Sequence, residues 1–146
     1  MPDQETLERA QEDAEEGKSP STQAGEFVRE EIHHVREGKH GVRSPQQAIA
    51  IGLSKARRAG VKLPAPKGNA SLRKKAAQDA KAAKKSRRKV SRTRQRATSK
   101  ALRRESRRGA SHDALSRQAK RASAKRGAQS RKKAAQKAAR TRQRAA

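Results

Sequence analysis

The sequence predicts an all-α protein that contains an acidic helix, a small helical hairpin and a long basic tail of low complexity. Two observations support this fold class. Before Pro66, apolar residues recur at helical spacing between residues that typically begin and end helices. After Pro66, large apolar residues become rare, and Lys, Arg and Ala dominate the composition. The first part of the chain can therefore form a small core, whereas the second cannot.

Net charge divides the chain at the same place. The chain of 146 residues holds 40 Lys and Arg against 14 Asp and Glu, which gives a net charge of +26. Residues 1–66 carry ten of these cations and eleven of the acids, a net charge of −1, so all the excess positive charge lies beyond them. We predict four segments: an acidic N-terminal helix (1–18), a helical hairpin (19–63), a Pro/Gly linker (64–68) and a basic tail (69–146).

The first expected helix covers residues 3–16 and is strongly acidic. Leu7, Ala10 and Ala14 lie along one face, and Gly17 ends the helix. Residues 3–31 contain ten acidic and three basic residues. Because this segment is tethered to the tail, we expect it to compete transiently with nucleic-acid phosphates for tail cations. The alternative is that these acids only cap and solubilise the first helices.

Two further helices with clear start signals form the predicted hairpin. The first begins at Ser19-Pro20 and runs to about Glu37, with an apolar stripe that Glu31 interrupts: Ala24, Phe27, Val28, Ile32 and Val35. The second begins at Ser44-Pro45, ends at Gly60, and places these residues on one face: Ala48, Ile49, Gly52, Leu53, Ala56 and Ala59. A short turn joins the two helices, so they should pack antiparallel.

The core of this hairpin is expected to be small. Burial of about eight large side chains, at roughly 1.5–3 kcal/mol each, barely offsets the entropic cost of ordering the segment. We therefore expect marginal stability alone, or help from a partner protein or a second copy. Ile51 points away from the main apolar face. It is either part of such a contact or an isolated exposed residue.

The basic tail repeats fragments without a fixed period. The sequence RKKAAQ occurs at residues 73–78 and again at 131–136, and RTRQRA occurs at 92–97 and again at 140–145. Ala, Lys, Arg and Gln favour helix, but repulsion between like charges opposes it. We expect the tail to be disordered in isolation and to become helical when a polyanion neutralises its charge.

This charge density predicts that the partner is nucleic acid. Contacts between Lys or Arg and phosphates release counterions and give strong, salt-dependent binding without sequence readout. The tail has no aromatic residue on which single-stranded bases could stack. We therefore expect non-specific, histone-like binding and compaction of duplex DNA. RNA binding stays open, as does an adaptor role in which the hairpin binds another protein and the tail holds it near nucleic acid.

The expected phosphate-binding residues are the clustered cations of the tail. They are Arg73, Lys74, Lys75, Lys84, Lys85, Arg87, Arg88, Lys89, Arg92, Arg94, Arg96, Arg103, Arg104, Arg107, Arg108, Arg131, Lys132, Lys133, Arg140, Arg142 and Arg144.

The sequence carries no enzyme signature, and we expect no catalytic residue, cofactor or metal. Gly17-Lys18-Ser19 resembles the end of a P-loop, but the glycine required upstream is replaced by Glu12. His33 and His34 lie among Glu30, Glu31 and Glu37 at i, i+4 spacing. Adjacent histidines point about 100° apart on a helix, and no closed ligand set is visible in the sequence. We therefore interpret them as exposed helix-surface residues.

Further classes are excluded by composition. No apolar run approaches the ~18 residues of a membrane span. The acidic N-terminus is unlike a secretory signal peptide. The absence of Cys excludes disulfides and thiolate chemistry. We expect a cytoplasmic, nucleoid-associated protein.

Two resemblances agree with this expectation. Residues 17–64, GKSPSTQAGEFVREEIHHVREGKHGVRSPQQAIAIGLSKARRAGVKLP, resemble the DUF6496 family of small bacterial proteins, in which such a block precedes a Lys/Arg/Ala tail. Members tend to be labelled as DNA-binding or plasmid-stabilisation proteins. The tail is similar to the Ala/Lys-rich tails of linker histones and bacterial histone-like proteins, as in residues 74–77 and 132–135. The resemblance implies nucleoid or plasmid maintenance and supplies no ligand residue.

Overall fold

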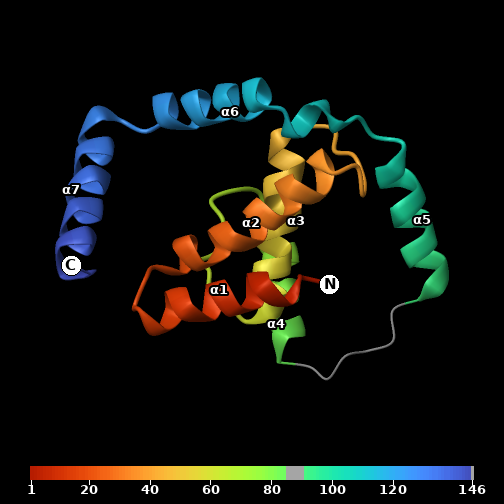
Figure 1. The fold of residues 1–146 in the computed structure, drawn as a ribbon, viewed down its shortest axis with the longest axis horizontal. Coiled ribbons are helices and arrows are strands. Elements are labelled where there is room, and N and C mark those ends of the chain that lie inside the picture. Colours follow the sequence, from red (N-terminus) through yellow and green to blue (C-terminus); the bar gives the residue numbers. More distant parts are fainter. Residues whose placement is uncertain (85–90, 146) are drawn as a thin grey trace. The chain divides into compact units, whose positions relative to one another are not determined.

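The computed structural model describes residues 1–84 and 91–145. Over these ranges the chain forms seven α-helices and one short 3-10 helix, with no strand, so the predicted all-α class is confirmed (Figure 1). The chain forms two compact units, Met1–Ser111 and His112–Ala146. The predicted linker at residues 64–68 therefore lies inside the first unit.

The first unit begins with the three helices that the sequence predicts. They are α1 (Gln4–Glu15), α2 (Pro20–Arg36) and α3 (Pro45–Ala59). The Ser19 side chain accepts a hydrogen bond from the Thr22 amide, and the Ser44 side chain accepts one from the Gln47 amide. Gly60 ends α3 at φ 104°, a left-handed conformation that glycine adopts without strain. The capping signals thus placed both hairpin helices correctly.

Two small apolar clusters hold these helices together. Phe27 lies in the first cluster with Ala10, Ala24 and Ala56, so α1 packs against the hairpin. Asp13 of α1 is buried beside Lys18, whereas the expected apolar residue Ala14 is exposed. The second cluster contains Val35, Val42, Ala48 and Ala110, with Ile32 and Ile51 packed against it.

Ile51 is thus not an isolated exposed residue, because it packs against the second cluster. Its neighbours in the second cluster include Ala110, a residue of the predicted tail. Tail residues therefore add to the core of the hairpin, which is expected from the sequence to be small.

The described part of the tail is mostly helical, so the prediction of a disordered tail is not confirmed. Its elements are α4 (Ala70–Ala83), α5 (Arg92–Arg103), η1 (Arg107–Ala110), α6 (His112–Lys125) and α7 (Ala128–Ala145). The physical reason is local: Ala, Lys, Arg and Gln are strong helix formers, and the tail has no Pro to interrupt them.

Residues 102–110, which we call the clasp, fasten the tail to the turn between α2 and α3. The Gly41 amide donates to the Leu102 carbonyl at 2.9 Å, and the Val42 amide donates to the Ser106 carbonyl at 2.9 Å. Arg36 Nε donates to the Ala110 carbonyl at 3.0 Å. Gly41 makes this approach possible, because a Cβ there would lie 1.8 Å from the Glu105 carbonyl oxygen.

Helix α4 is hydrogen-bonded to α3 through one buried acid, Asp79. The Asp79 side chain is 4% exposed and accepts hydrogen bonds from Ser54, Arg58 and Lys75 at 2.8–3.0 Å. Burial raises the pKa of Asp79, but these three donors outweigh it, and the pKa is lowered overall.

Among the described helices, none is long and apolar enough to cross a bilayer.

Candidate nucleic-acid interface and polar cluster

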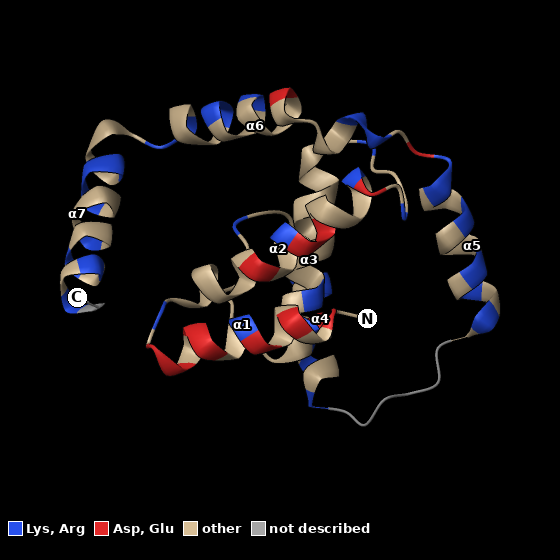
Figure 2. Cartoon of the chain, viewed as in Figure 1, with Lys and Arg blue, Asp and Glu red and all other residues tan. Residues whose placement is uncertain are grey.

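Helices α5 and α7 carry cations and no acid. Helix α5 holds five Lys or Arg in 12 residues, and α7 holds seven in 18 residues. Figure 2 shows these cations spread along both helices, in contrast to the acidic α1. The side chains of all twelve are exposed. These two helices therefore present positive charge to solvent without acids of their own to neutralise it.

Four of the α5 cations form a stripe on one helix face. Arg92, Arg96, Lys100 and Arg103 are spaced four, four and three residues apart. At 3.6 residues per turn, these spacings place them within an arc of about 80°. Arg94 lies on another face. The stripe gives α5 one strongly basic side.

A similar stripe occurs on α7. Lys133, Lys137, Arg140 and Arg144 are spaced four, three and four residues apart, which places them within an arc of about 60°. The remaining cations of α7, including Lys132 and Arg142, lie on other faces. Lys100 and Lys137 were not among the expected binding residues. Helical spacing applied to the tail could have found both.

The stripes are on the scale of a DNA backbone. At 1.5 Å per residue, each stripe extends over 11 residue steps, or about 16 Å, and presents one cation per ~5.5 Å. One strand of B-DNA presents one phosphate per ~3.4 Å along the helix axis. Each stripe can therefore contact several phosphates of one strand.

All the expected binding residues that the structure describes are exposed, and two of them also have contacts within the chain. Lys75 contacts Asp79, and Arg131 donates to the Ser123 and Arg126 carbonyls, so both have structural contacts. Lys85, Arg87, Arg88 and Lys89 lie outside the described residues. The other exposed ones are Arg73, Lys74, Lys84, Arg92, Arg94, Arg96, Arg103, Arg104, Arg107, Arg108, Lys132, Lys133, Arg140, Arg142 and Arg144.

Two of the three tail acids have cation partners from the hairpin. Asp79 contacts Arg58 at 2.9 Å, and Glu105 contacts Arg43 at 3.3 Å. The third, Asp113, is exposed beside His112. The tail acids that lie in the first unit therefore serve mainly to fasten the tail to the hairpin.

A second candidate site is a buried polar cluster between α1, α2 and α3. Glu30 and Glu31 have side chains only 3% and 1% exposed, and Lys55 Nζ contacts Glu30 Oε1 at 2.7 Å and Glu31 Oε2 at 2.9 Å. Burial lowers the pKa of Lys55, but its contacts with the two carboxylates outweigh burial and raise the pKa overall. Glu31, which interrupts the apolar stripe of α2, is thus a buried carboxylate whose partner, the Lys55 ammonium, is partly exposed.

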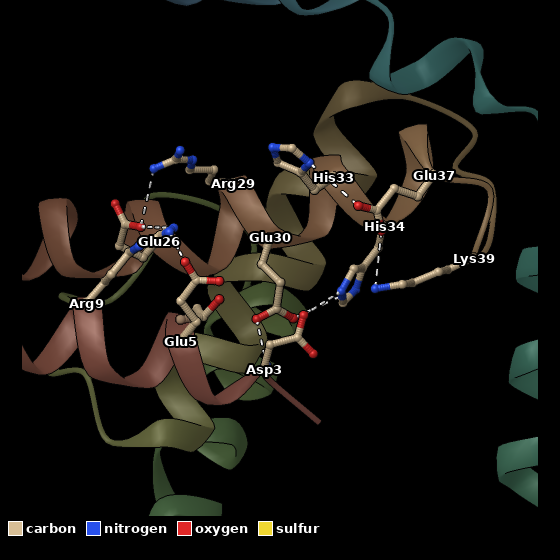
Figure 3. A pocket seen from close by; sticks show the side chains of 11 residues that line it. Asp3, Glu5, Arg9, Glu26, Arg29, Glu30, His33, His34, Glu37 and Lys39 are labelled. Carbon is tan, nitrogen blue, oxygen red and sulfur yellow. Dashed lines mark hydrogen bonds and ion pairs between the residues drawn. The ribbon is translucent and has the colours of Figure 1, made fainter.

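Two histidines join this cluster. His34 lies 3.0 Å from Asp3 Oδ2 and 3.8 Å from Glu30 Oε1, as Figure 3 shows for its contact with Asp3. His40, in the turn after α2, lies 3.1 Å from Glu31 Oε1. His33 is exposed on the helix surface, as expected, whereas the His34 side chain is only 12% exposed. Helical spacing does not predict the cluster, because His40 lies in the turn after α2 and contacts Glu31 from there.

The described residues define an all-α protein whose helical hairpin is built around a buried ion-pair cluster and followed by cation-rich helices. Residues 17–67 match the model of DUF6496, a family of unknown function, and this match supports the family assignment of that segment. No curated protein and no solved structure matches the chain. The matched segment contains α2, α3, His34, His40 and Lys55, and it ends before α4.

Proposed function

We propose that the protein binds duplex DNA non-specifically through backbone phosphates and compacts it. The observation that carries this proposal is the pair of acid-free helices α5 and α7, each with an exposed stripe of four cations. Phosphate contacts of this kind position a protein on DNA without reading its sequence. A role in nucleoid or plasmid maintenance would follow from such binding.

The composition of the stripes supports duplex DNA over single strands. Arg can contact a phosphate with two hydrogen bonds, whereas Lys acts as a compact charge, and both stripes contain both residues. Neither helix has an aromatic residue on which an unpaired base could stack. RNA binding and an adaptor role for the hairpin remain alternatives that the experiments below separate.

The first experiment measures affinity as a function of salt. The full chain is titrated with two duplexes of equal length and unrelated sequence, and with a single strand and an RNA duplex of the same length. If about ten phosphates are contacted, log K falls with log[salt] at a slope near −9. Equal affinity for both DNA duplexes is expected. Tighter binding to RNA would favour the RNA alternative, and no salt-dependent binding would contradict the proposal.

A second experiment tests the stripe on α7 with matched variants. The stripe variant carries Lys133→Gln and Arg140→Gln, whereas the control carries Lys132→Gln and Arg142→Gln. Both remove one Lys and one Arg from exposed positions of the same helix. If the stripe faces the phosphates, the stripe variant lowers the salt slope by about 2, and the control lowers it less. Equal losses would mean that α7 binds through its total charge.

A further inference from the structure

Glu31, His34 and His40 meet inside the hairpin with their polar atoms close together. One donor atom from each of these three residues lies within 4.8 Å of the others. They come from adjacent turns of α2 and from the turn that follows it. Carboxylate oxygen and imidazole nitrogen are the ligands that Zn²⁺ and related divalent ions accept.

The hydrogen bonds of the two histidines leave one nitrogen of each ring free to bind a metal. His40 Nδ1 lies 3.1 Å from the Gly41 carbonyl, which can only accept, so Nδ1 carries the proton. His34 Nε2 lies 3.0 Å from the Asp3 carboxylate and carries its proton for the same reason. His40 Nε2 and His34 Nδ1 remain. Metal-binding histidines almost always donate their other N–H to a carboxylate or a backbone carbonyl in this way.

The Glu31 carboxylate, in the same place, is buried without a hydrogen-bond donor of good geometry among the described residues. Its side chain is 1% exposed, and neither oxygen accepts a hydrogen bond of good geometry from any described residue. Oε2 lies beside Lys55, whereas Oε1 lies 3.1 Å from the free nitrogen of His40. Two electron-rich atoms face each other here, which is unfavourable unless a cation or a proton lies between them.

The charge of the cluster favours a bound cation. Glu30 and Glu31 contribute two buried negative charges, and Lys55 contributes one positive charge to both carboxylates. Asp3, which is exposed, adds a third negative charge, and Lys39 and Lys55 both act on it. A bound cation would offset the negative charge that remains on the buried carboxylates.

We propose that Glu31 Oε1, His34 Nδ1 and His40 Nε2 bind one divalent transition-metal ion of the Zn²⁺ type, with Asp3 and the Gly41 carbonyl orienting the two imidazoles. Around a tetrahedral Zn²⁺, with bonds of about 2.0–2.2 Å, neighbouring donors lie about 3.4 Å apart. The 3.1 Å between His40 Nε2 and Glu31 Oε1 is close to that spacing. The fourth position is left for water or an external ligand.

A second set, Asp3, Glu30 and His34, also has three donor atoms within 4.8 Å of one another. It is the weaker choice, because Glu30 Oε1 is bound by Lys55 and Glu30 Oε2 accepts from the Asp3 amide. Asp3 itself has a side chain that is 58% exposed. A groove of about 340 Å³ lined by Asp3, Glu30 and His34 opens beside the cluster and gives an ion a route to His34 (Figure 3).

The test uses the full chain without a histidine tag, freed of metal with a chelator and titrated with Zn²⁺. Calorimetry is expected to give one ion per chain, and Co²⁺ is expected to give the visible absorption of a bound ion. The variants His40→Gln and His34→Gln should each weaken Zn²⁺ binding by at least about tenfold, the loss that even outer-shell changes cause. The matched control is His33→Gln, an exposed neighbour on the same helix, which should bind as the parent does.

Circular dichroism shows whether each variant is folded, and the two histidine variants provide independent tests. The absence of stoichiometric Zn²⁺ binding by the folded parent would overturn the proposal and would leave protonated imidazoles as the source of positive charge. Equal losses in His33→Gln and His40→Gln would also overturn it, because the ion would then bind at the surface.

Discussion

Lys55 is the charge partner of the two buried carboxylates in the hairpin. Its ammonium contacts Glu30 and Glu31, whose side chains are almost completely buried. A carboxylate inside a protein is tolerated only with a charge partner or good hydrogen bonds. The hairpin therefore contains two buried carboxylates beside its small apolar core, and Lys55 stabilises both.

We expect Lys55→Met to destabilise the protein strongly. The change leaves two buried carboxylates without their ammonium partner, which typically costs about 3–5 kcal/mol. Urea unfolding in chelator-treated buffer measures the free energy of unfolding. The control is Lys62→Met, at an exposed position, which should change it by less than about 0.5 kcal/mol. Similar values for the two variants would contradict the assigned role of Lys55.

Asp79 should make stability depend on pH. Its pKa is lowered from 3.8, since the donors Lys75, Ser54 and Arg58 outweigh the effect of burial. A group whose pKa is lowered on folding contributes stability above its unfolded pKa and loses that contribution as pH falls through the folded pKa. Asp79→Asn should therefore lower the free energy of unfolding by about 1–3 kcal/mol at neutral pH. The difference from the parent should shrink below about pH 4, and a constant difference would contradict this assignment.

At the scale of elements, the crossing of α2 and α3 depends on Gly52. A Cβ at Gly52 would lie 2.7 Å from the Val28 Cα, which is a backbone atom and cannot move aside cheaply. Gly25, in α2, has nothing within 4 Å of the same position. The two glycines differ in their surroundings, although both lie in helix interiors.

We expect opposite effects of Ala at these two glycines. Gly25→Ala should stabilise the protein by about 0.5–1 kcal/mol, because Ala favours helix and restricts the unfolded chain. Gly52→Ala should destabilise it by about 1–3 kcal/mol, because the helices must separate. Thermal unfolding of both variants provides the comparison. Stabilisation by both would mean that α2 and α3 do not approach closely at Gly52.

Helix α3 shows how far sequence can predict this fold. Ser44, Pro45 and Gly60 mark its ends, and its apolar spacing places Ala48, Gly52 and Ala56 on the buried face. Ala59, predicted on the same face, is exposed, and Ile51, predicted to point away, packs against the second cluster. The clasp was missed because its buried residues, Gly109 and Ala110, carry no hydrophobic signal that distinguishes them from the rest of the tail. What buries them is the lack of side-chain bulk at Gly41 and Gly109, a steric fact that hydropathy patterns do not contain.

The polar cluster was missed for a different reason. The i, i+4 spacing of Glu30 and His34 is visible in the sequence, and their side chains are 3.8 Å apart. The contact of His40 with Glu31 depends on the path of the turn after Gly38, and helical periodicity does not apply there. Lys55 contributes from α3, so its role requires the packing of two helices.

On the scale of the whole molecule, the carboxylates of α1 and the phosphates of DNA can compete for the cations of the tail. The compact packing of α1 means that deleting residues 1–16 would expose core residues such as Phe27. Neutralising Glu8, Glu12 and Glu15, which are exposed, avoids this. If α1 competes with phosphates, the triple Glu→Gln variant should bind duplex DNA up to about tenfold more tightly at low salt, with the difference fading as screening increases. Equal affinities at low salt would leave α1 a solubilising helix.

The two compact units predict where the chain can be cut. Residues 112–146 carry twelve Lys and Arg against one acid, but the apolar clusters and the clasp lie within residues 1–111. A chain that ends at Ser111 should keep the thermal unfolding of the parent while its DNA affinity falls and its salt slope becomes shallower. A chain that ends at Pro66 lacks Asp79 and Ala110, so its hairpin should unfold at a lower temperature.

The comparison of these two truncations also separates the proposed functions. If phosphate contacts are the function, the chain of residues 1–111 retains only the binding that its own cations supply, and DNA compaction weakens with it. If the hairpin is an adaptor, the same chain keeps the full affinity for its protein partner, because α2 and α3 remain folded. Fluorescence anisotropy with duplex DNA, and capture of partners by residues 1–111 compared with the unstable 1–66, measure the two outcomes. Unchanged DNA affinity and salt slope after loss of residues 112–146 would contradict a binding role for α7.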